Sequence, residues 1–236
     1  MHRLCAKIHP AMINPAPARP LSSSIGDYLK AIWTSSETGA VSTKEISQTL
    51  SVAPASVTNM LVRLQEMGLV RYERYRGAAL TEEGRAEALR LIRRHRLIET
   101  FLLEHLGYSW QHVHEEAERL EHTVSDEFTE RLAEFLGHPG HDPHGAPIPA
   151  VDGTLEPDDS FPLSDAGAGR RVRIYKVGDD DSMLEYLGER GLVPGRTLTV
   201  KEVRELDGVI TVEDEGGETY SFGSPVARRV FVRPVP

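Results

Sequence analysis

The chain has 236 residues, of which 39% are hydrophobic and 27% charged. This length fits two or three modest domains, and the composition is typical of a folded soluble protein rather than a disordered one. No apolar run approaches the roughly 18 residues that a membrane-spanning helix needs, which excludes an integral membrane protein. The single cysteine, Cys5, excludes a disulfide framework and a cysteine-rich metal site, and it is typical of the reducing cytoplasm.

The net charge of -9 is unevenly distributed along the chain. Residues 1–100 contain 14 Lys and Arg against 9 Asp and Glu, whereas residues 101–236 contain 13 against 27. A polyanion would therefore bind to the first part of the chain. Charge alone does not decide this, because unequal halves are common in acidic proteins.

The first 80 residues predict a proline-rich arm followed by three helices and a hairpin. Residues 1–20 contain four prolines and are expected to be a disordered arm. Ser22–Ser24 can cap the first helix, Ser42 and Glu45 form a capping box that opens the second, and Pro54 suits the first turn of the third. Residues 69–80 alternate with period two and turn at Arg76-Gly77, which predicts a hairpin. The helices are expected over 25–35, 42–50 and 53–67.

The remainder predicts a helical segment, a linker and a small β domain. Long helices are expected from about Thr81 to His105 and from about Trp110 to Leu136. Residues 137–170 hold six Pro and six Gly in 34 positions, which indicates a linker or irregular segment rather than a packed element. Short strands and one helix then predict a small SH3-type barrel. The strands are expected over 171–177, 197–203, 209–213, 219–222 and 230–232, and the helix over 181–190.

The predicted order of elements is that of a winged helix-turn-helix: three helices, with a short turn before the third, and then a basic hairpin. The third helix combines an apolar face with a polar face that can meet base edges, and the hairpin arginines suit phosphate contact. An ordinary three-helix bundle with a solvated hairpin is the alternative interpretation. The candidate DNA contacts are Thr43, Ser56, Thr58, Asn59, Arg63, Arg74 and Arg76.

A second pattern predicts a metal site on the long helices. His114, Glu118, Glu121 and His122 follow in steps of four, three and one, so they share one helical face, and His95 and Glu99 share another. A solvated acidic face is the alternative. Carboxylates and imidazoles without thiolates suit Mn(II) or Fe(II), and they also accept Zn(II) or Co(II). No nucleophile or base in a catalytic arrangement is apparent, so we expect no enzyme.

From Ser24 onward, the chain resembles the diphtheria toxin repressor and manganese repressor family of metal-dependent transcriptional repressors. The resemblance implies an α+β chain with five regions: an arm (1–20), a winged helix-turn-helix domain (21–80), a helical metal-binding and dimerisation domain (81–150), a linker (151–170) and an SH3-like, FeoA-like domain (171–236). It is carried by Asp27-Tyr28-Leu29, Ala55-Ser56-Val57-Thr58, Leu80-Thr81-Glu82-Glu83-Gly84, Arg94 to Glu99, Val113 to His122, and Pro143-His144-Gly145-Ala146-Pro147-Ile148-Pro149.

The resemblance also assigns the ligands. It implies a primary site made by Asp27, Glu118, Glu121 and His122, and an ancillary site made by His95, Glu99, His114 and, from the C-terminal domain, Asp180. Asp27 and Glu118 are the residue types of manganese-type members. Lys30 stands where small two-domain manganese repressors have a glutamate, so two separate mononuclear sites are expected instead of a binuclear cluster.

The function expected from this resemblance is a cytoplasmic, homodimeric, manganese-responsive repressor of metal-uptake genes that binds a double-stranded DNA operator. Metal would fix the orientation of the two DNA-binding domains. An iron-responsive repressor and a metal-responsive activator of the same family are the alternatives. Outside the family, the alternative hypotheses are a metalloenzyme with a DNA-binding module and a repressor that senses an organic ligand. Neither a membrane nor an organic substrate is expected as a partner.

Overall fold

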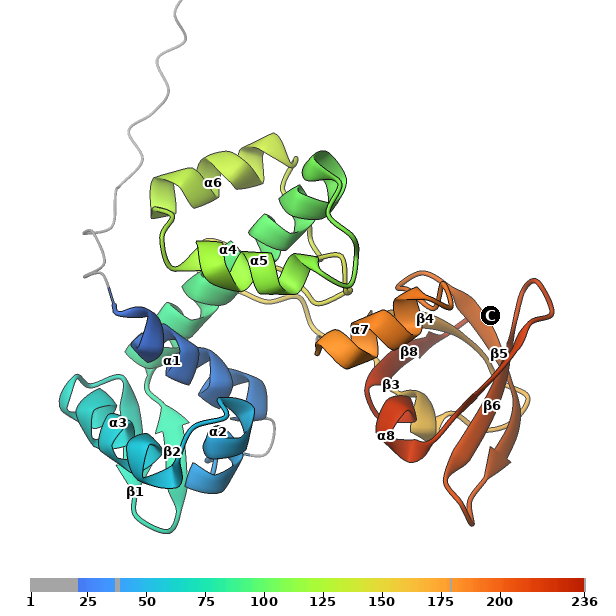
Figure 1. Cartoon of the computed structure of the whole chain (residues 1–236), viewed down its shortest axis with the longest axis horizontal. Helices are drawn as coiled ribbons and strands as arrows, with labels where there is room; N and C mark the ends of the chain where they lie inside the picture. Colours follow the sequence, from blue (N-terminus) through green and yellow to red (C-terminus); the bar gives the residue numbers. More distant parts are fainter. Residues whose placement is uncertain (1–20, 37–38, 179, 236) are drawn as a thin grey trace, which may run out of the picture.

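The computed structural model describes residues 21–36, 39–178 and 180–235. The predicted arm of residues 1–20 lies outside the described residues. Figure 1 shows three modules in chain order, with a helical module between a DNA-binding-type module and a β-barrel. The predicted α+β class and this order of modules are confirmed. In the described part of the chain, no helix is both long and apolar enough to cross a membrane.

The first module contains the predicted helices and hairpin. The capping box is present: the Ser42 side chain accepts a hydrogen bond from the Glu45 amide, and the Glu45 carboxylate accepts one from the Ser42 amide. A core that includes Leu29, Ile46 and Leu61 joins the three helices to the hairpin. The elements are α1 (Ser23–Ser35), α2 (Thr43–Thr49), α3 (Pro54–Glu66), β1 (Val70–Glu73) and β2 (Gly77–Leu80).

Close backbone contact fixes the hairpin against the loop before α2. Val41 and Ala78 form an isolated antiparallel bridge, with reciprocal backbone hydrogen bonds of 2.8 Å. Gly77 has a φ of +99°, and a Cβ there would lie 2.5 Å from the Val41 carbonyl oxygen. Only glycine fits both the positive φ and this close approach. The hairpin therefore projects from the module at a defined angle.

The middle module contains α4 (Glu82–Leu106), α5 (Val113–Glu121) and α6 (Asp126–Phe135). The predicted single helix from Trp110 to Leu136 is wrong, because it is two helices. Ser125 caps α6 by accepting a hydrogen bond from the Phe128 amide. The Arg94 guanidinium binds the carbonyl oxygen of Glu121 at 2.8 Å, so the last turn of α5 ends on a tertiary contact.

The C-terminal module is a six-stranded antiparallel sheet in the order β3-β8-β4-β5-β6-β7, which encloses an apolar core (Figure 1). The five predicted strands and the predicted helix are present, whereas β3 and α8 were not predicted. The elements are β3 (Phe161–Pro162), β4 (Arg171–Val177), α7 (Asp181–Gly188), β5 (Thr197–Arg204), β6 (Val209–Asp214), β7 (Thr219–Phe222), α8 (Ser224–Ala227) and β8 (Val230–Pro234).

Two parts of the segment predicted to be unpacked are packed. Phe161 pairs with β8 and Leu163 is completely buried in the barrel core, so the predicted linker of residues 151–170 includes the start of the barrel. Upstream, Asp142 and His144 are buried, and the His144 carbonyl accepts a hydrogen bond from the Val177 amide of β4. The prolines and glycines of this segment therefore shape a tight connection between two modules.

We predict that Asp214→Ala destabilises the barrel. The Asp214 carboxylate accepts hydrogen bonds from Arg196 at 2.6 Å and from the Gly216 and Glu218 amides, and these bonds hold its pKa below the ordinary value of 3.8. Because the pKa is lowered on folding, this stabilisation is complete above pH 3.8 and is lost as the pH falls below it. Thermal unfolding at pH 7 and pH 3 measures both effects. Glu215→Ala, an exposed neighbour, is the control.

Candidate metal centre and DNA-binding surface

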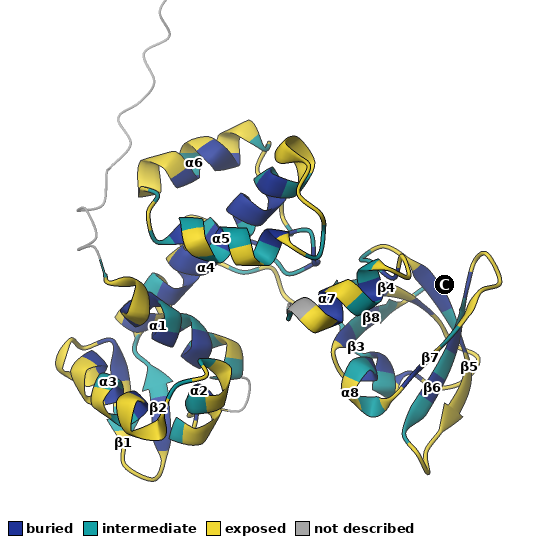
Figure 2. Cartoon of the chain, in the orientation of Figure 1, coloured by how far each residue is buried: buried dark blue, intermediate teal, exposed yellow. Residues whose placement is uncertain are grey.

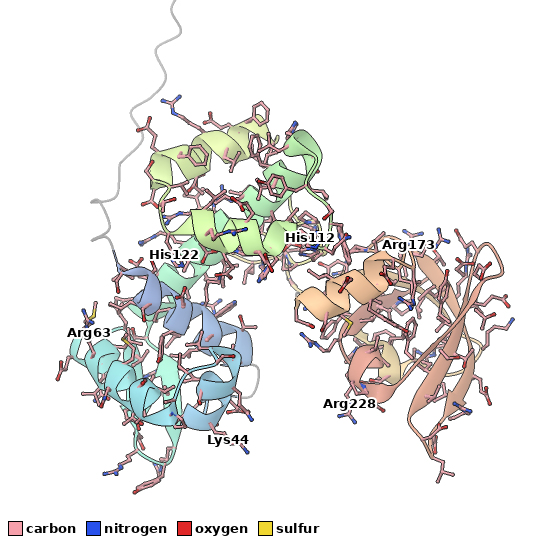
Figure 3. The ribbon with its side chains drawn as sticks, in the orientation of Figure 1. Lys44, Arg63, His112, His122, Arg173 and Arg228 are labelled. Atoms are coloured by element: carbon pink, nitrogen blue, oxygen red, sulfur yellow. The ribbon has the colours of Figure 1, made fainter. Side chains whose placement is uncertain are left out.

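Four of the predicted ligands gather between α1 and the C-terminal end of α5. Asp27 comes from α1, Glu118 and Glu121 come from the last turn of α5, and His122 directly follows that helix. Each offers a ligand atom, and these four atoms all lie within 4.8 Å of one another. Figure 3 shows His122 at the boundary between the first and middle modules. We name this group the primary cluster.

Gly26 allows α1 to approach α5 this closely. A Cβ on Gly26 would lie 2.8 Å from a methyl carbon of Leu91 and 3.2 Å from the His122 ring. A larger residue would require the Leu91 methyl group and the His122 ring to shift. Gly26 was not among the predicted site residues, although it directly precedes the predicted ligand Asp27.

The carboxylates of the primary cluster are in contact with basic groups. His122 Nε2 lies 2.9 Å from Asp27 Oδ1 and 3.4 Å from Glu121 Oε1. Burial raises the pKa of Asp27, Glu118 raises it further, and His122 opposes both. Burial also works to raise the pKa of Glu121, but contacts with His95 and Lys30 outweigh it and hold that pKa below its usual value. Glu121 is therefore a carboxylate at neutral pH although its side chain is 0% exposed.

Lys30 contacts two of the candidate ligands directly. Its Nζ donates to Glu118 Oε1 at 2.6 Å and to the two oxygens of Glu121 at 2.8 and 3.0 Å. Burial lowers the pKa of Lys30, but the two carboxylates outweigh it and raise that pKa above its usual value. The lysine is therefore an ammonium ion located among the predicted ligands.

The predicted ancillary ligands on α4 and α5 lie next to the primary cluster. Glu99 Oε1 is 2.9 Å from His95 Nε2 and 3.0 Å from His114 Nδ1. His95 also contacts Glu121 through Nδ1, so it connects the two groups. Burial disfavours the His95 imidazolium, but Glu99 and Glu121 outweigh both burial and the repulsion from Lys30 and raise its pKa to about 10.

Two further candidate ligands, Asp142 and His144, were not predicted. Together with Glu99 they form a buried group whose ligand atoms also lie within 4.8 Å of one another. His144 Nδ1 is buried, has no hydrogen-bond partner and is 3.7 Å from Glu99 Oε1. His144 belongs to the Pro143-to-Pro149 motif of the sequence, but no helical periodicity marks it as a ligand.

Asp180, the predicted ligand from the barrel, lies outside these groups. Its side chain caps α7 by accepting from the Met183 amide, and it forms an ion pair with Arg229 at 2.5 Å. The seven other predicted ligands form one continuous set of contacts. Their carboxylate and imidazole donors fit a hard or borderline divalent cation, and the separations within the groups are those of ligands around one ion.

The candidate DNA contacts occupy one side of the first module. Ser56, Asn59 and Arg63 are exposed on α3, whose outer face is yellow in Figure 2, and Arg63 extends into solvent in Figure 3. Thr58 is half-buried, and its hydroxyl donates to the Pro54 carbonyl, so it is less free to reach a base than predicted. Thr43 is half-buried at the start of α2.

The hairpin turn adds cations and an aromatic ring to this surface. Arg74 and Arg76 are exposed there, and Arg76 also pairs with Glu73 at 3.1 Å. Tyr75 is 93% exposed, and the Arg74 guanidinium lies 5.4 Å from the centre of its ring. Exposed arginines at such a turn suit phosphate contact beside a groove.

Comparisons with known proteins match three successive domains along the chain. The iron-dependent repressor N-terminal DNA-binding domain matches residues 20–78, the iron-dependent repressor metal-binding and dimerisation domain matches residues 81–150, and the FeoA domain matches residues 161–234. The iron-dependent repressor IdeR of Mycobacterium tuberculosis is 31% identical over 222 residues, covering 88% of this chain and 96% of the relative. The chain belongs to the iron-dependent repressor family.

Solved structures of similar proteins extend the comparison. A manganese-dependent transcriptional repressor in complex with manganese is 38% identical with a TM-score of 0.84, covering 89% of this chain and 100% of that one. ScaR with bound Zn²⁺ is 35% identical with a TM-score of 0.80, covering 89% of this chain and 99% of that one.

As a member of the iron-dependent repressor family, the chain is a metal-dependent DNA-binding repressor and not an enzyme. The predicted family, including its FeoA domain, is confirmed. The DNA-binding and dimerisation domains of the family imply an operator and a homodimer.

Proposed function

We propose that this repressor responds to manganese and that the primary cluster is its sensing site. The observation that carries the proposal is the position of the cluster, which takes Asp27 from the DNA-binding module and Glu118, Glu121 and His122 from the dimerisation module. Oxygen-rich donors without thiolates favour a hard cation. The manganese repressor at 38% identity supports the same metal, whereas the IdeR relative at 31% keeps iron as the alternative to be tested.

The cluster can set the orientation of the DNA-binding module. Asp27 of α1, Glu118 and Glu121 of α5, and His122 would hold a divalent cation, which would supply the positive charge that neutralises the carboxylates. Asp27 lies on α1, and α1 packs against α2 and the hairpin. The position of α1 therefore determines the direction of α3. In a twofold dimer, two recognition helices must be about 34 Å apart, or a multiple, to enter successive turns of the major groove. Ligand geometry then controls operator affinity, and DNA strengthens metal binding in return.

The apolar end of the helical module is the surface we propose for the dimer. Leu106, Phe128 and Phe135 are 56%, 46% and 64% exposed. Phe135 packs edge-on against Phe101 and His105 of α4, so this face combines α4 and α6. Exposed aromatic groups of this size are typical of protein interfaces rather than of a solvated surface.

Glu99, Asp142 and His144 support a second metal centre that links the helical module to the barrel. Asp142 Oδ1 accepts hydrogen bonds from the His144 and Ala146 amides, and Arg96 contacts its other oxygen at 3.2 Å. His144 Nε2 contacts the Trp110 carbonyl, while its own carbonyl holds β4. Its Nδ1 is therefore the ring atom available to a cation beside Glu99.

The first prediction from the proposed function concerns the primary cluster. Asp27→Ala and His122→Ala should each weaken Mn²⁺ binding by more than the roughly 10–100-fold that loss of an outer-shell partner costs, and abolish metal-stimulated operator binding. Fluorescence anisotropy of a labelled operator against Mn, Fe, Co and Zn, with a chelator control, measures this. Glu115→Ala, an exposed carboxylate on the same helix, should behave like the wild type. A normal response by either cluster variant would contradict the proposal.

The second prediction concerns stoichiometry. His144→Ala should reduce the number of tightly bound Mn²⁺ ions per chain from two to one while the primary site stays occupied. Calorimetric titration followed by metal analysis counts the ions. His112→Ala, an exposed histidine before α5, is the matched control. Two ions retained in His144→Ala would show that the second centre lies elsewhere.

The third prediction separates base reading from phosphate contact. Asn59→Ala should cost about 1–3 kcal/mol at the operator and relax specificity at one position, whereas Arg74→Ala should weaken all DNA binding and reduce the salt slope by about one. Operator and random duplexes titrated at several salt concentrations distinguish the two. An unchanged operator preference in Asn59→Ala would exclude Asn59 from base reading.

A further inference from the structure

Lys30 joins the same two modules that the primary cluster joins. It lies on α1 of the DNA-binding module, and its partners Glu118 and Glu121 lie 88 and 91 positions away on α5. Its three contacts with carboxylate oxygens, of 2.6 to 3.0 Å, have the length of charge-assisted hydrogen bonds. A tethered cation therefore lies on the oxygens of two candidate ligands.

These contacts are stronger than those of an ordinary surface lysine. The Lys30 side chain is 16% exposed and that of Glu121 is 0% exposed, so the ammonium and the carboxylate are largely removed from water. Exposed ion pairs contribute little to stability, whereas removing one partner of a buried ion pair is strongly destabilising. Among the described residues, no other lysine or arginine forms an ion pair with the Glu118 or Glu121 carboxylate.

We propose that Lys30 competes with the divalent metal for Glu118 and Glu121 and thereby sets the metal concentration at which the repressor is loaded. This inference rests on the proposed function of the primary cluster. The ammonium group and a divalent cation draw on the same carboxylate oxygens and repel each other, so the metal binds at the expense of the ion pair and its affinity is lowered. Lys30 also holds α1 against α5 when no metal is bound.

The neighbouring basic groups do not provide the same competition. Arg94 is bound to the backbone carbonyl of Glu121 and to the Asp126 carboxylate, not to the Glu121 side chain. His95 and His122 carry ring nitrogens that can themselves be ligands. Lys30, in contrast, has no lone pair to offer while it remains an ammonium ion. It can only oppose the metal at this position.

The test is the Mn²⁺ affinity of Lys30→Met, measured by calorimetry without DNA. Methionine keeps most of the length of the side chain and removes the charge, so Mn²⁺ should bind about tenfold more tightly or better, the equivalent of at least one charge-assisted hydrogen bond. Lys30→Arg should remain near the wild type because it keeps the charge. Lys201→Met, which removes a barrel lysine paired with Glu213 at 3.3 Å, is the control and should change nothing.

Thermal unfolding of the same proteins separates competition from a merely structural role. Without metal, Lys30→Met should unfold at a lower temperature than the wild type, and saturating Mn²⁺ should abolish this difference. If Lys30 had only a structural role, its substitution would lower the unfolding temperature both with and without metal. If Lys30→Met does not fold, Lys30→Gln provides the same comparison with a neutral polar group.

The outcomes distinguish this inference from the proposed function. Wild-type protein that binds no Mn²⁺, or binds its operator regardless of metal, would overturn the proposed function. Wild-type protein that responds to Mn²⁺ while Lys30→Met binds it equally or more weakly would overturn only the role of Lys30. Tighter binding by Lys30→Met with an unchanged Lys201→Met supports the competition.

Discussion

Negative charge enclosed between two modules is the constraint on which the arrangement of this repressor depends. Asp27 comes from α1 and Glu118 and Glu121 from α5, and Glu121 is wholly buried. A buried carboxylate is costly unless a cation or hydrogen-bond donor accompanies it. The packing of the DNA-binding module on the helical module is therefore sensitive to which cation occupies this position.

The same contacts continue toward the barrel. His95 links Glu121 to Glu99, Glu99 faces His144, and the backbone of His144 holds β4. Side chains of the first two modules and of the connecting segment thus lie along one path, which starts at α1 and reaches the barrel through the backbone hydrogen bond from Val177 to His144. This path places each charged group in the electrostatic field of the next. It also explains why the connection between helices and barrel is packed despite its prolines and glycines.

Local signals in the sequence predicted most elements correctly. The capping box at Ser42, the early proline at Pro54 and the alternation of the hairpin act within a few residues, so they need no tertiary information. The helix predicted from Trp110 to Leu136 failed because its periodicity continues across the break. Arg94 binds the last carbonyl of α5 and Ser125 caps the start of α6, and the contact from Arg94 reaches across 27 positions of the chain.

The sequence by itself determined the chemistry of the site, because helical geometry converts the spacing of His114, Glu118, Glu121 and His122 into one face of oxygen and nitrogen donors. Only the tertiary structure decided which groups meet that face. It placed Lys30 among the candidate ligands, brought Asp142 and His144 to Glu99, and paired Asp180 with Arg229 instead. These pairings depend on how helices and loops distant in the chain pack together, and no local spacing encodes such packing.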